Sequence, residues 1–297
     1  MYQNRRFFIR YLAALLLFGS NGFIASHIAL GSSQIVLLRT LLGSVSLLAF
    51  FFLSGHRFSF ARRGKDVTLI LLSGAAMGAS WMFLYAGYQT IGVSTASLLY
   101  YCGPVIVMAL SPLVFREALT WVKITGFVCV CGGIVLVNGW GGEGLSVSGF
   151  LYGLLSAVCY AVMLILNKKA KSVDGMENSL LQMLSATATV FVLLLCQGGL
   201  SMTITGASWP WILLLGFLNT GFGCWCYFSS IGSLPVQTVA VCGYLEPLSA
   251  VIFSALLLHE RLTPPQLIGA CLIIGGALFA ECIHPRHKAT VSSSNGH

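Results

Sequence analysis

An internal repeat dominates this sequence, because a shift of 143 residues lays its second half over its first. The matching pairs include Tyr101 with Tyr244, Pro104 with Pro247, Glu117 with Glu260, Gly126 with Gly269, and Gly133 with Gly276. The alignment needs no gap from the second apolar segment of each copy to the last. A solenoid would need three or more shorter repeats. We therefore expect two equivalent units arranged around a common centre.

The composition predicts that both units lie in a membrane. Only 8% of the 297 residues are charged and 57% are hydrophobic, whereas a soluble domain carries about 25% charged residues. The net charge of +8 does not predict nucleic-acid binding, since the basic residues fall in short loops between apolar runs. A duplicated membrane unit is typical of a transporter with a central site.

Ten apolar runs are each about long enough to cross a hydrocarbon core of about 30 Å as a helix. They cover residues 7–28, 33–54, 67–89, 93–115, 120–139, 147–168, 178–198, 209–231, 236–258 and 265–283. The expected fold is an all-α integral membrane protein. The expected domains are a first five-helix repeat over 1–139, a second over 147–283, and a disordered cytoplasmic tail over 284–297.

The basic residues predict the orientation. With a cytoplasmic N-terminus, 14 of the 16 Lys and Arg residues lie on the cytoplasmic side, so both termini are expected there. Five spans per repeat is an odd number, so the second repeat must enter the membrane inverted. Inverted repeats can exchange roles, which is the geometric basis of alternating access.

The repeated signature resembles that of a known family. It reads Pro104 followed by Glu117-Ala118-Leu119-Thr120, and Pro247 followed by Glu260-Arg261-Leu262-Thr263. This pattern, with Arg39 in the second span, resembles the drug/metabolite transporter superfamily and its bacterial EamA-type members. The resemblance implies an inner-membrane exporter or exchanger of small metabolites. It also implies a cavity lined mainly by spans 1, 3, 4, 6, 8 and 9.

The two prolines mark the expected centre of the molecule. Pro104 and Pro247 fall in mid-span, where a proline removes a backbone hydrogen bond and opens the helix. Open backbone at that depth needs protein or a wet cavity beside it. We expect these helix kinks to line and flex the central site; the alternative is a static packing kink.

Several side chains are candidates for binding substrate. Tyr101 and Tyr244 lie too deep for an interfacial belt, whereas Tyr88 is assigned to that belt. The other candidates are Asn21 and the aromatic residues Trp81, Tyr85, Trp225 and Tyr227, for which core packing is the alternative.

Glu246 is the only acid deep inside a span. A charge there costs roughly 2.5–3.5 kcal/mol on insertion scales, so the residue is a functional candidate. It is expected to couple transport to protons or to contact a substrate amine; the alternative is a structural acid beside Pro247. Arg39 is assigned a structural role, and Gln182 occupies the equivalent place in the second repeat.

The remaining repeated residues are assigned structural roles. Glu117 and Glu260 end helices at the water boundary and are expected to staple hairpins together. The glycine pairs Gly126 with Gly133 and Gly269 with Gly276 are each seven residues apart, hence on one helix face, where small residues let two helices approach closely.

No phosphate loop, metal-ligand cluster or Ser/His/Asp set is visible in the sequence, so we expect no enzyme activity, cofactor or metal. The predicted protein is a monomeric secondary transporter of small amphipathic metabolites such as aromatic or other neutral amino acids, with protons as a candidate coupling ion. The alternatives are export of drugs or other small solutes, a membrane-embedded enzyme, or a non-transporting scaffold.

Cysteine labelling in a Cys-free background tests the topology. The charge bias predicts that a single cysteine at position 143 reacts with a membrane-impermeant reagent from outside the cell. Labelling of that position only from the cytoplasm would reverse the orientation.

Overall fold

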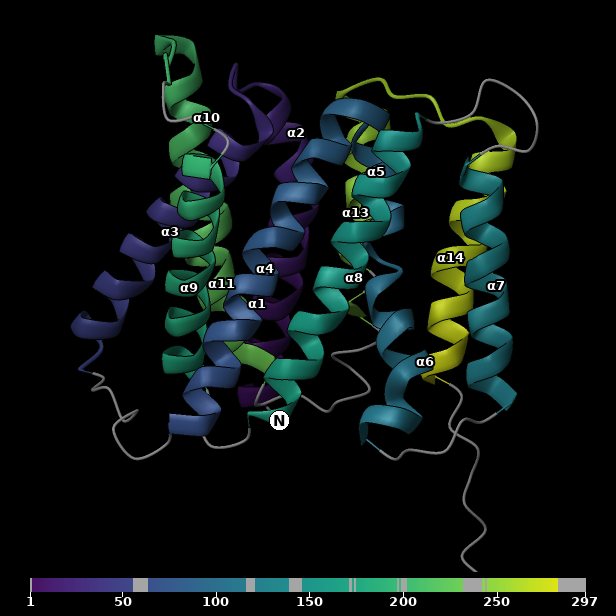
Figure 1. The fold of residues 1–297 in the computed structure, drawn as a ribbon, viewed down its shortest axis with the longest axis horizontal. Coiled ribbons are helices and arrows are strands. Elements are labelled where there is room, and N and C mark those ends of the chain that lie inside the picture. Colours follow the sequence, from purple (N-terminus) through teal and green to yellow (C-terminus); the bar gives the residue numbers. More distant parts are fainter. Residues whose placement is uncertain are drawn as a thin grey trace, which may run out of the picture.

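The computed structural model describes residues 2–55, 64–115, 121–138, 146–170, 173, 175–196, 198, 202–231, 242–243 and 245–282. These residues form helices and no β-strand, and most of the helices run roughly parallel or antiparallel to one another (Figure 1). The helices are α1 (Tyr2–Gly19), α2 (Asn21–Ser26), α3 (Ser32–Leu53), α4 (Gly64–Ile91), α5 (Val93–Tyr100), α6 (Gly103–Phe115), α7 (Trp121–Asn138), α8 (Val147–Lys169), α9 (Gly175–Cys196), η2 (Gly206–Ser208), α10 (Trp209–Leu213), the π-helix η3 (Leu214–Phe222), α11 (Gly223–Ile231), α13 (Leu245–Leu257) and α14 (Pro264–Cys282).

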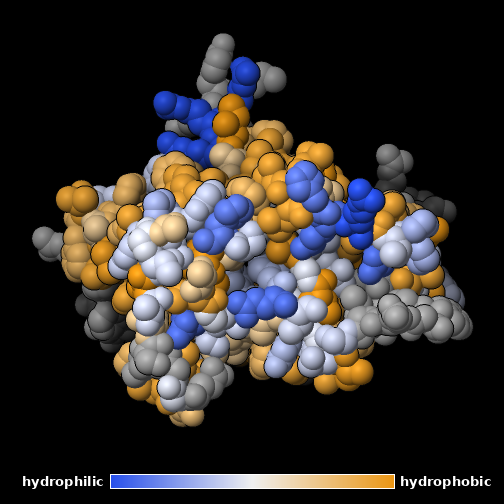
Figure 2. All heavy atoms as spheres, turned by 90° about the horizontal axis from the view of Figure 1, so that it is seen from above, coloured by the Kyte–Doolittle hydropathy of each residue, from blue (hydrophilic) through white to orange (hydrophobic). Residues whose placement is uncertain are grey.

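The outer surface of the bundle is apolar. Large hydrophobic side chains stand exposed on most helices, with Leu53 86% and Trp121 82% exposed. Seen end-on in Figure 2, hydrophobic residues form most of the outline and hydrophilic ones gather over the middle of the end face. An aqueous solvent would not tolerate so much exposed apolar area, so the surface is suited to lipid.

Five helical segments are long and apolar enough to cross a membrane: Arg5–Ser26, Ser32–Leu53, Gly64–Ile91, Val147–Lys169 and Gly175–Cys196. The expected all-helical fold is therefore confirmed for the described residues, and the count of ten spans stays a prediction.

The helices pack in pairs that the repeat relates to each other. α3 packs on α9 and α7 packs on α14, and each pair consists of equivalent helices from the two halves. The contact between α4 and α8 has its counterpart in the contact between α11 and α1. Ser44 and Thr187, which are 143 residues apart, share a hydrogen bond of 2.9 Å. The two copies thus meet face to face along a pseudo-two-fold axis.

Glycines let α7 and α14 approach closely. A side chain at Gly133 would come within 2.7 Å of the Gly269 carbonyl oxygen, and one at Gly276 within 3.0 Å of the Gly126 carbonyl oxygen. All four glycines that the sequence singles out therefore lie at this contact between the two halves.

Three of the predicted spans are not regular α-helices throughout. The run 93–115 divides into α5 and α6, with a turn at Tyr101 and Cys102 between them. Pro104 lies in the first turn of α6, where a missing N–H is tolerated. The run 7–28 divides at Ser20, and the run 209–231 contains the π-helix η3. The sequence predicts an opening of the helix at Pro104, and the structure has a turn just before this proline. The break at Ser20 and the π-helix were not predicted, because apolar composition does not report a change in backbone hydrogen bonding.

Glu260 ties the two halves together at one end of the bundle. It lies in the link from α13 to α14, and its carboxyl oxygens accept hydrogen bonds from the backbone N–H groups of Val93 (2.9 Å) and Ser94 (3.0 Å). The Ser254 hydroxyl also donates to this carboxyl group and accepts from Ser94 Oγ at 2.7 Å. Glu260 thus caps α5 of the other half rather than only its own hairpin. Its counterpart Glu117 lies outside the described residues.

The cap controls the ionisation of Glu260. Burial of the carboxyl group acts to raise its pKa, but the hydrogen bonds from Ser254, Ser94 and Val93 outweigh burial and hold the pKa of Glu260 below its usual value. A carboxyl group with a lowered folded pKa stabilises the fold above its unfolded pKa, about 4.3 for Glu. That contribution is lost as the pH falls through the folded pKa.

Removing this cap is predicted to destabilise the protein. Glu260→Ala should lower the free energy of unfolding in detergent by about 1–3 kcal/mol, the usual cost of a lost cap and charged hydrogen bonds. The exposed neighbour Arg261→Ala should change it by less than about 0.5 kcal/mol. Between about pH 5 and pH 3 the wild-type unfolding temperature should fall more steeply than that of Glu260→Gln. Parallel curves would contradict the assigned cap.

Candidate functional site

A cavity of about 190 Å³ lies at the centre of the bundle. A single water needs about 10–15 Å³ of such volume, so the space holds a small solute or a group of waters. Its lining comes from nine helices in both halves of the chain: α1, α2, α3, α4 and α5 of the first half, and α8, α9, α11 and α13 of the second half. α3 and α9 also line the cavity, although they are not among the spans that the family resemblance implies.

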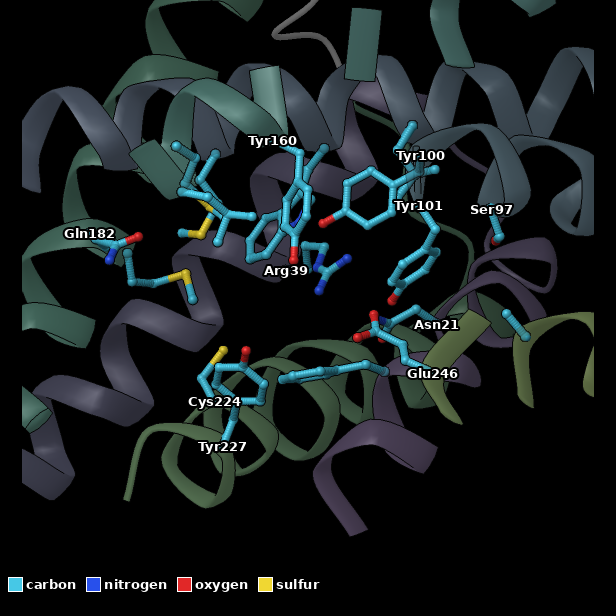
Figure 3. Close-up of a pocket in the computed structure, with 18 of the residues that line it drawn as sticks. Asn21, Arg39, Ser97, Tyr100, Tyr101, Tyr160, Gln182, Cys224, Tyr227 and Glu246 are labelled. Atoms are coloured by element: carbon cyan, nitrogen blue, oxygen red, sulfur yellow. The ribbon is translucent and has the colours of Figure 1, made fainter. Parts of the chain in front are cut away.

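Aromatic side chains form much of the wall. The seven that line the cavity are Phe18, Trp81, Tyr88, Tyr100, Tyr101, Tyr160 and Tyr227. The polar and charged lining residues are Asn21, Arg39, Ser97, Asn167, Ser179, Gln182 and Glu246. Figure 3 shows Arg39 and Glu246 reaching into the same space from different helices. A wall of this kind suits a solute with both apolar and polar parts.

The lining follows the sequence repeat. Four pairs of lining residues are each related by the shift of 143 residues: Asn21 with Leu164, Arg39 with Gln182, Trp81 with Cys224, and Leu84 with Tyr227. The cavity therefore lies on the pseudo-two-fold axis. The chemistry of the cavity is not symmetric. In three of the pairs an apolar side chain or a thiol is the counterpart of a more polar or larger side chain, and in the fourth a guanidinium is the counterpart of an amide.

Arg39 is held firmly at the cavity wall. Its side chain is only 3% exposed. Nε donates to Thr220 Oγ1 at 3.2 Å, and Nη1 donates to the Tyr85 hydroxyl at 2.6 Å. The guanidinium carbon lies 4.3 Å from the centre of the Trp81 ring, within the range of a cation–π interaction. The side chain is therefore fixed by three neighbours, two from α4 and one from η3.

Glu246 lies at the start of α13. It stands in the first turn of α13, one residue before Pro247, where the helix N-terminus favours negative charge. The Tyr101 hydroxyl points toward its carboxyl group (Figure 3). Tyr101 is 7% exposed, and its hydroxyl has no hydrogen-bond partner in bonding geometry among the described residues. Such a group normally has a partner, so a bound molecule or water is expected there.

The structure brings together most of the candidates from the sequence. Asn21, Trp81, Tyr101, Tyr227 and Glu246 all line the cavity. The candidate Tyr244 lies outside the described residues.

Two candidates lie elsewhere. Tyr85 is not part of the wall but supports Arg39 through its hydroxyl. Trp225 faces away from the cavity, with its ring 4.8 Å from that of Phe50 and 5.5 Å from that of Phe222. The two-residue separation from Tyr227 turns Trp225 to a different side of α11.

Some lining residues were not among those candidates. Tyr88 lines the cavity and packs against Tyr85 in a tilted arrangement with 5.0 Å between ring centres, so the assignment to an interfacial belt is wrong. Gln182 could have been found from the repeat, because it is the counterpart of Arg39. Tyr160 could not, since its counterpart is Leu17.

Asn219 is not part of the cavity wall, but its side chain bonds to the residues at the break between α1 and α2. Its side-chain amide nitrogen lies 2.6 Å from the Leu17 carbonyl oxygen, 2.9 Å from Ser20 Oγ and 3.0 Å from Asn21 Oδ1. The residue belongs to the π-helix η3, and such bulges often occur at functional sites. It positions the break between α1 and α2, and with it Asn21 at the cavity.

Known proteins share this sequence and fold. The EamA-like transporter family profile matches residues 7–139 and again 147–281. The "Uncharacterized transporter YxxF" of Bacillus subtilis (strain 168) is 23% identical over 96% of this chain and 92% of its own length. The threonine/homoserine exporter RhtA of Salmonella typhimurium (strain SL1344) is 26% identical over 84% of this chain and 81% of its own.

A solved crystal structure with 17% sequence identity covers 93% of this chain and 97% of its own, with a TM-score of 0.66, which shows a shared fold. The resemblance inferred from the repeated signature is thus confirmed by two family matches that together span most of the sequence. The chain belongs to the EamA-like transporter family, and it is a multi-pass membrane protein.

Proposed function

We propose that this protein is a secondary transporter that exports or exchanges small amphipathic metabolites, in particular aromatic or other neutral amino acids, across a bacterial inner membrane. The observation that carries the proposal is the central cavity, which combines seven aromatic side chains with one guanidinium and one carboxyl group. A sugar phosphate or nucleotide would need several cationic side chains there. RhtA, a relative over most of the chain, exports amino acids by its name.

The placement of the cavity supports alternating access. Its lining includes Asn167 and Ser179, near the end of α8 and the start of α9, so it extends to that end of the bundle. The Glu260 cap joins the two halves at the opposite end, beside the start of α5. A cavity open toward one face and tied shut at the other is what one state of such a cycle requires.

The proposal includes ten spans in two inverted repeats, cytoplasmic termini and a monomer. The pseudo-two-fold packing of equivalent helices supports the paired repeats. We further propose protons as the coupling ion. Glu246 is the only acidic side chain among the described residues that line the cavity, and a carboxyl group can hold and release a proton there.

Transport by purified protein in proteoliposomes tests this function. Loading with amino acids, drugs and sugar phosphates in turn should show exchange of aromatic and other neutral amino acids, and no exchange of sugar phosphates. Glu246→Gln should retain exchange at saturating substrate, because Gln keeps the size of the side chain and an oxygen that can still accept a hydrogen bond. The variant should lose uphill transport driven by a pH gradient, since Gln cannot release a proton.

Two outcomes would contradict the proposal. Exchange of none of the amino acids would reject the substrate class. A Glu246→Gln variant that still concentrates substrate against its gradient in response to pH would reject proton coupling through this residue.

A further inference from the structure

We propose that Arg39 binds the carboxylate of the transported solute and that Glu246 faces its ammonium group. The cavity would then select α-amino acids over the amines and the carboxylic acids that carry only one of the two charges. This inference rests on the transport function proposed above and names the two residues that determine specificity.

The state of Arg39 points to an anionic ligand. A guanidinium has five N–H donors, and within the part of the chain that the structure describes two of those of Arg39 have acceptors, both of them neutral hydroxyl groups. No carboxylate lies within ion-pair distance of Arg39 among the described residues, although the side chain is almost completely buried. A buried charge without a directly paired counter-charge is costly. Its remaining donors, at the wall of the cavity, match a carboxylate in their planar, forked geometry.

The surroundings of Arg39 prepare it for this role. Thr220, Tyr85 and Trp81 hold the guanidinium in one orientation before any ligand arrives. A preorganised donor loses little conformational freedom on binding, which favours affinity. A merely structural arginine in an apolar core would be expected to pair with a carboxylate or with backbone carbonyl groups, rather than with two hydroxyls beside an open space.

The Glu246 end of the cavity offers hydrogen-bond acceptors, whereas the Arg39 end offers donors. The Glu246 carboxyl group and the Tyr101 hydroxyl, which has no partner in bonding geometry among the described residues, both present oxygen atoms to the cavity. An ammonium group is a donor only, so these oxygens match it. Glu246 and Arg39 do not form an ion pair with each other. The cavity thus keeps two opposite charges apart in one aromatic enclosure, as a zwitterion with an apolar side chain requires.

The repeat supports a functional rather than a structural role for the two charged side chains, because neither has a charged counterpart. The counterpart of Arg39 is Gln182, and the counterpart of Glu246 is Gly103. Gly103 packs so closely on α8 that a side chain there would come within 2.4 Å of Tyr160 Cδ1. Each charge therefore occurs once, and together they give the symmetric cavity a direction.

A competition experiment tests the inference. Wild-type protein in proteoliposomes exchanges labelled phenylalanine, and three unlabelled solutes compete: phenylalanine, phenethylamine, which lacks the carboxylate, and 3-phenylpropionate, which lacks the ammonium group. Phenylalanine should compete at least about tenfold better than either analogue, since one charged hydrogen-bonded contact accounts for a factor of that order.

The variants should then separate the two ends of the cavity. Arg39→Gln should weaken competition by phenylalanine and 3-phenylpropionate about tenfold or more and leave that by phenethylamine within about twofold. Glu246→Gln should weaken phenylalanine and phenethylamine instead. Gln182→Leu is the matched control at the position equivalent to Arg39, and it should shift all three solutes together.

Folding is kept separate from recognition. The ratio of competition by two solutes in one preparation does not depend on how much protein is active. Arg39→Lys keeps the charge and loses the fork, so it should weaken the two carboxylate-bearing solutes only, and by less than Arg39→Gln does. Arg39→Lys replaces Arg39→Gln in the experiment if Arg39→Gln does not fold.

The outcomes distinguish the inference from the function on which it rests. An equal loss for all three solutes in both Arg39 variants would make Arg39 a structural brace and overturn the inference while transport stands. Wild-type competition by phenethylamine as strong as that by phenylalanine would also overturn it. No exchange of phenylalanine or any other amino acid would overturn the proposed function itself.

Discussion

The bilayer offers no hydrogen-bonding partners, and this constraint explains where the protein places its polar groups. A group that cannot reach lipid headgroups must find its partner inside the bundle. Ser80 donates to the Ser156 carbonyl oxygen, Ser73 donates to that of Met163, and the Asn219 amide fills the break after α1. These contacts join helices that are far apart in sequence.

The exceptions to this rule coincide with the cavity. Counting only partners among the described residues, Arg39 keeps unused donors and Tyr101 keeps an unpartnered hydroxyl. The backbone is also interrupted between α5 and α6. Each costs free energy in an empty apolar interior. Their concentration in one space lined by both halves supports the view that a polar solute completes the site. The turn between α5 and α6 also removes the continuous helical connection at this point.

Much of the fold could be predicted from hydropathy, because each buried or lipid-facing helix leaves a long apolar run. The run 33–54 corresponds to Ser32–Leu53 and the run 147–168 to Val147–Lys169. The interruptions could not be predicted in this way, since a turn at Tyr101 is as apolar as the helix around it. The repeat supplied what hydropathy lacked: it indicated the pseudo-two-fold arrangement, and it marked Tyr101 as a residue of the centre.

The charged part of the site was harder to predict. An arginine in the outer part of a span has the sequence pattern of an anchor, and its partners Tyr85 and Thr220 are 46 and 181 residues away. Only the packed helices show that it faces the cavity. Trp225 was indistinguishable in sequence from the other deep aromatic residues, and its direction depends on the rotation of α11.

Substrate protection of Cys224 tests most directly whether this cavity is the substrate site. Cys224 lines the cavity and is the counterpart of Trp81. In a variant that retains only this cysteine, a small thiol reagent should react with it slowly, and a transported amino acid should slow that reaction in proportion to its occupancy of the transporter. A reaction rate unchanged at concentrations that saturate transport would show that the substrate binds elsewhere.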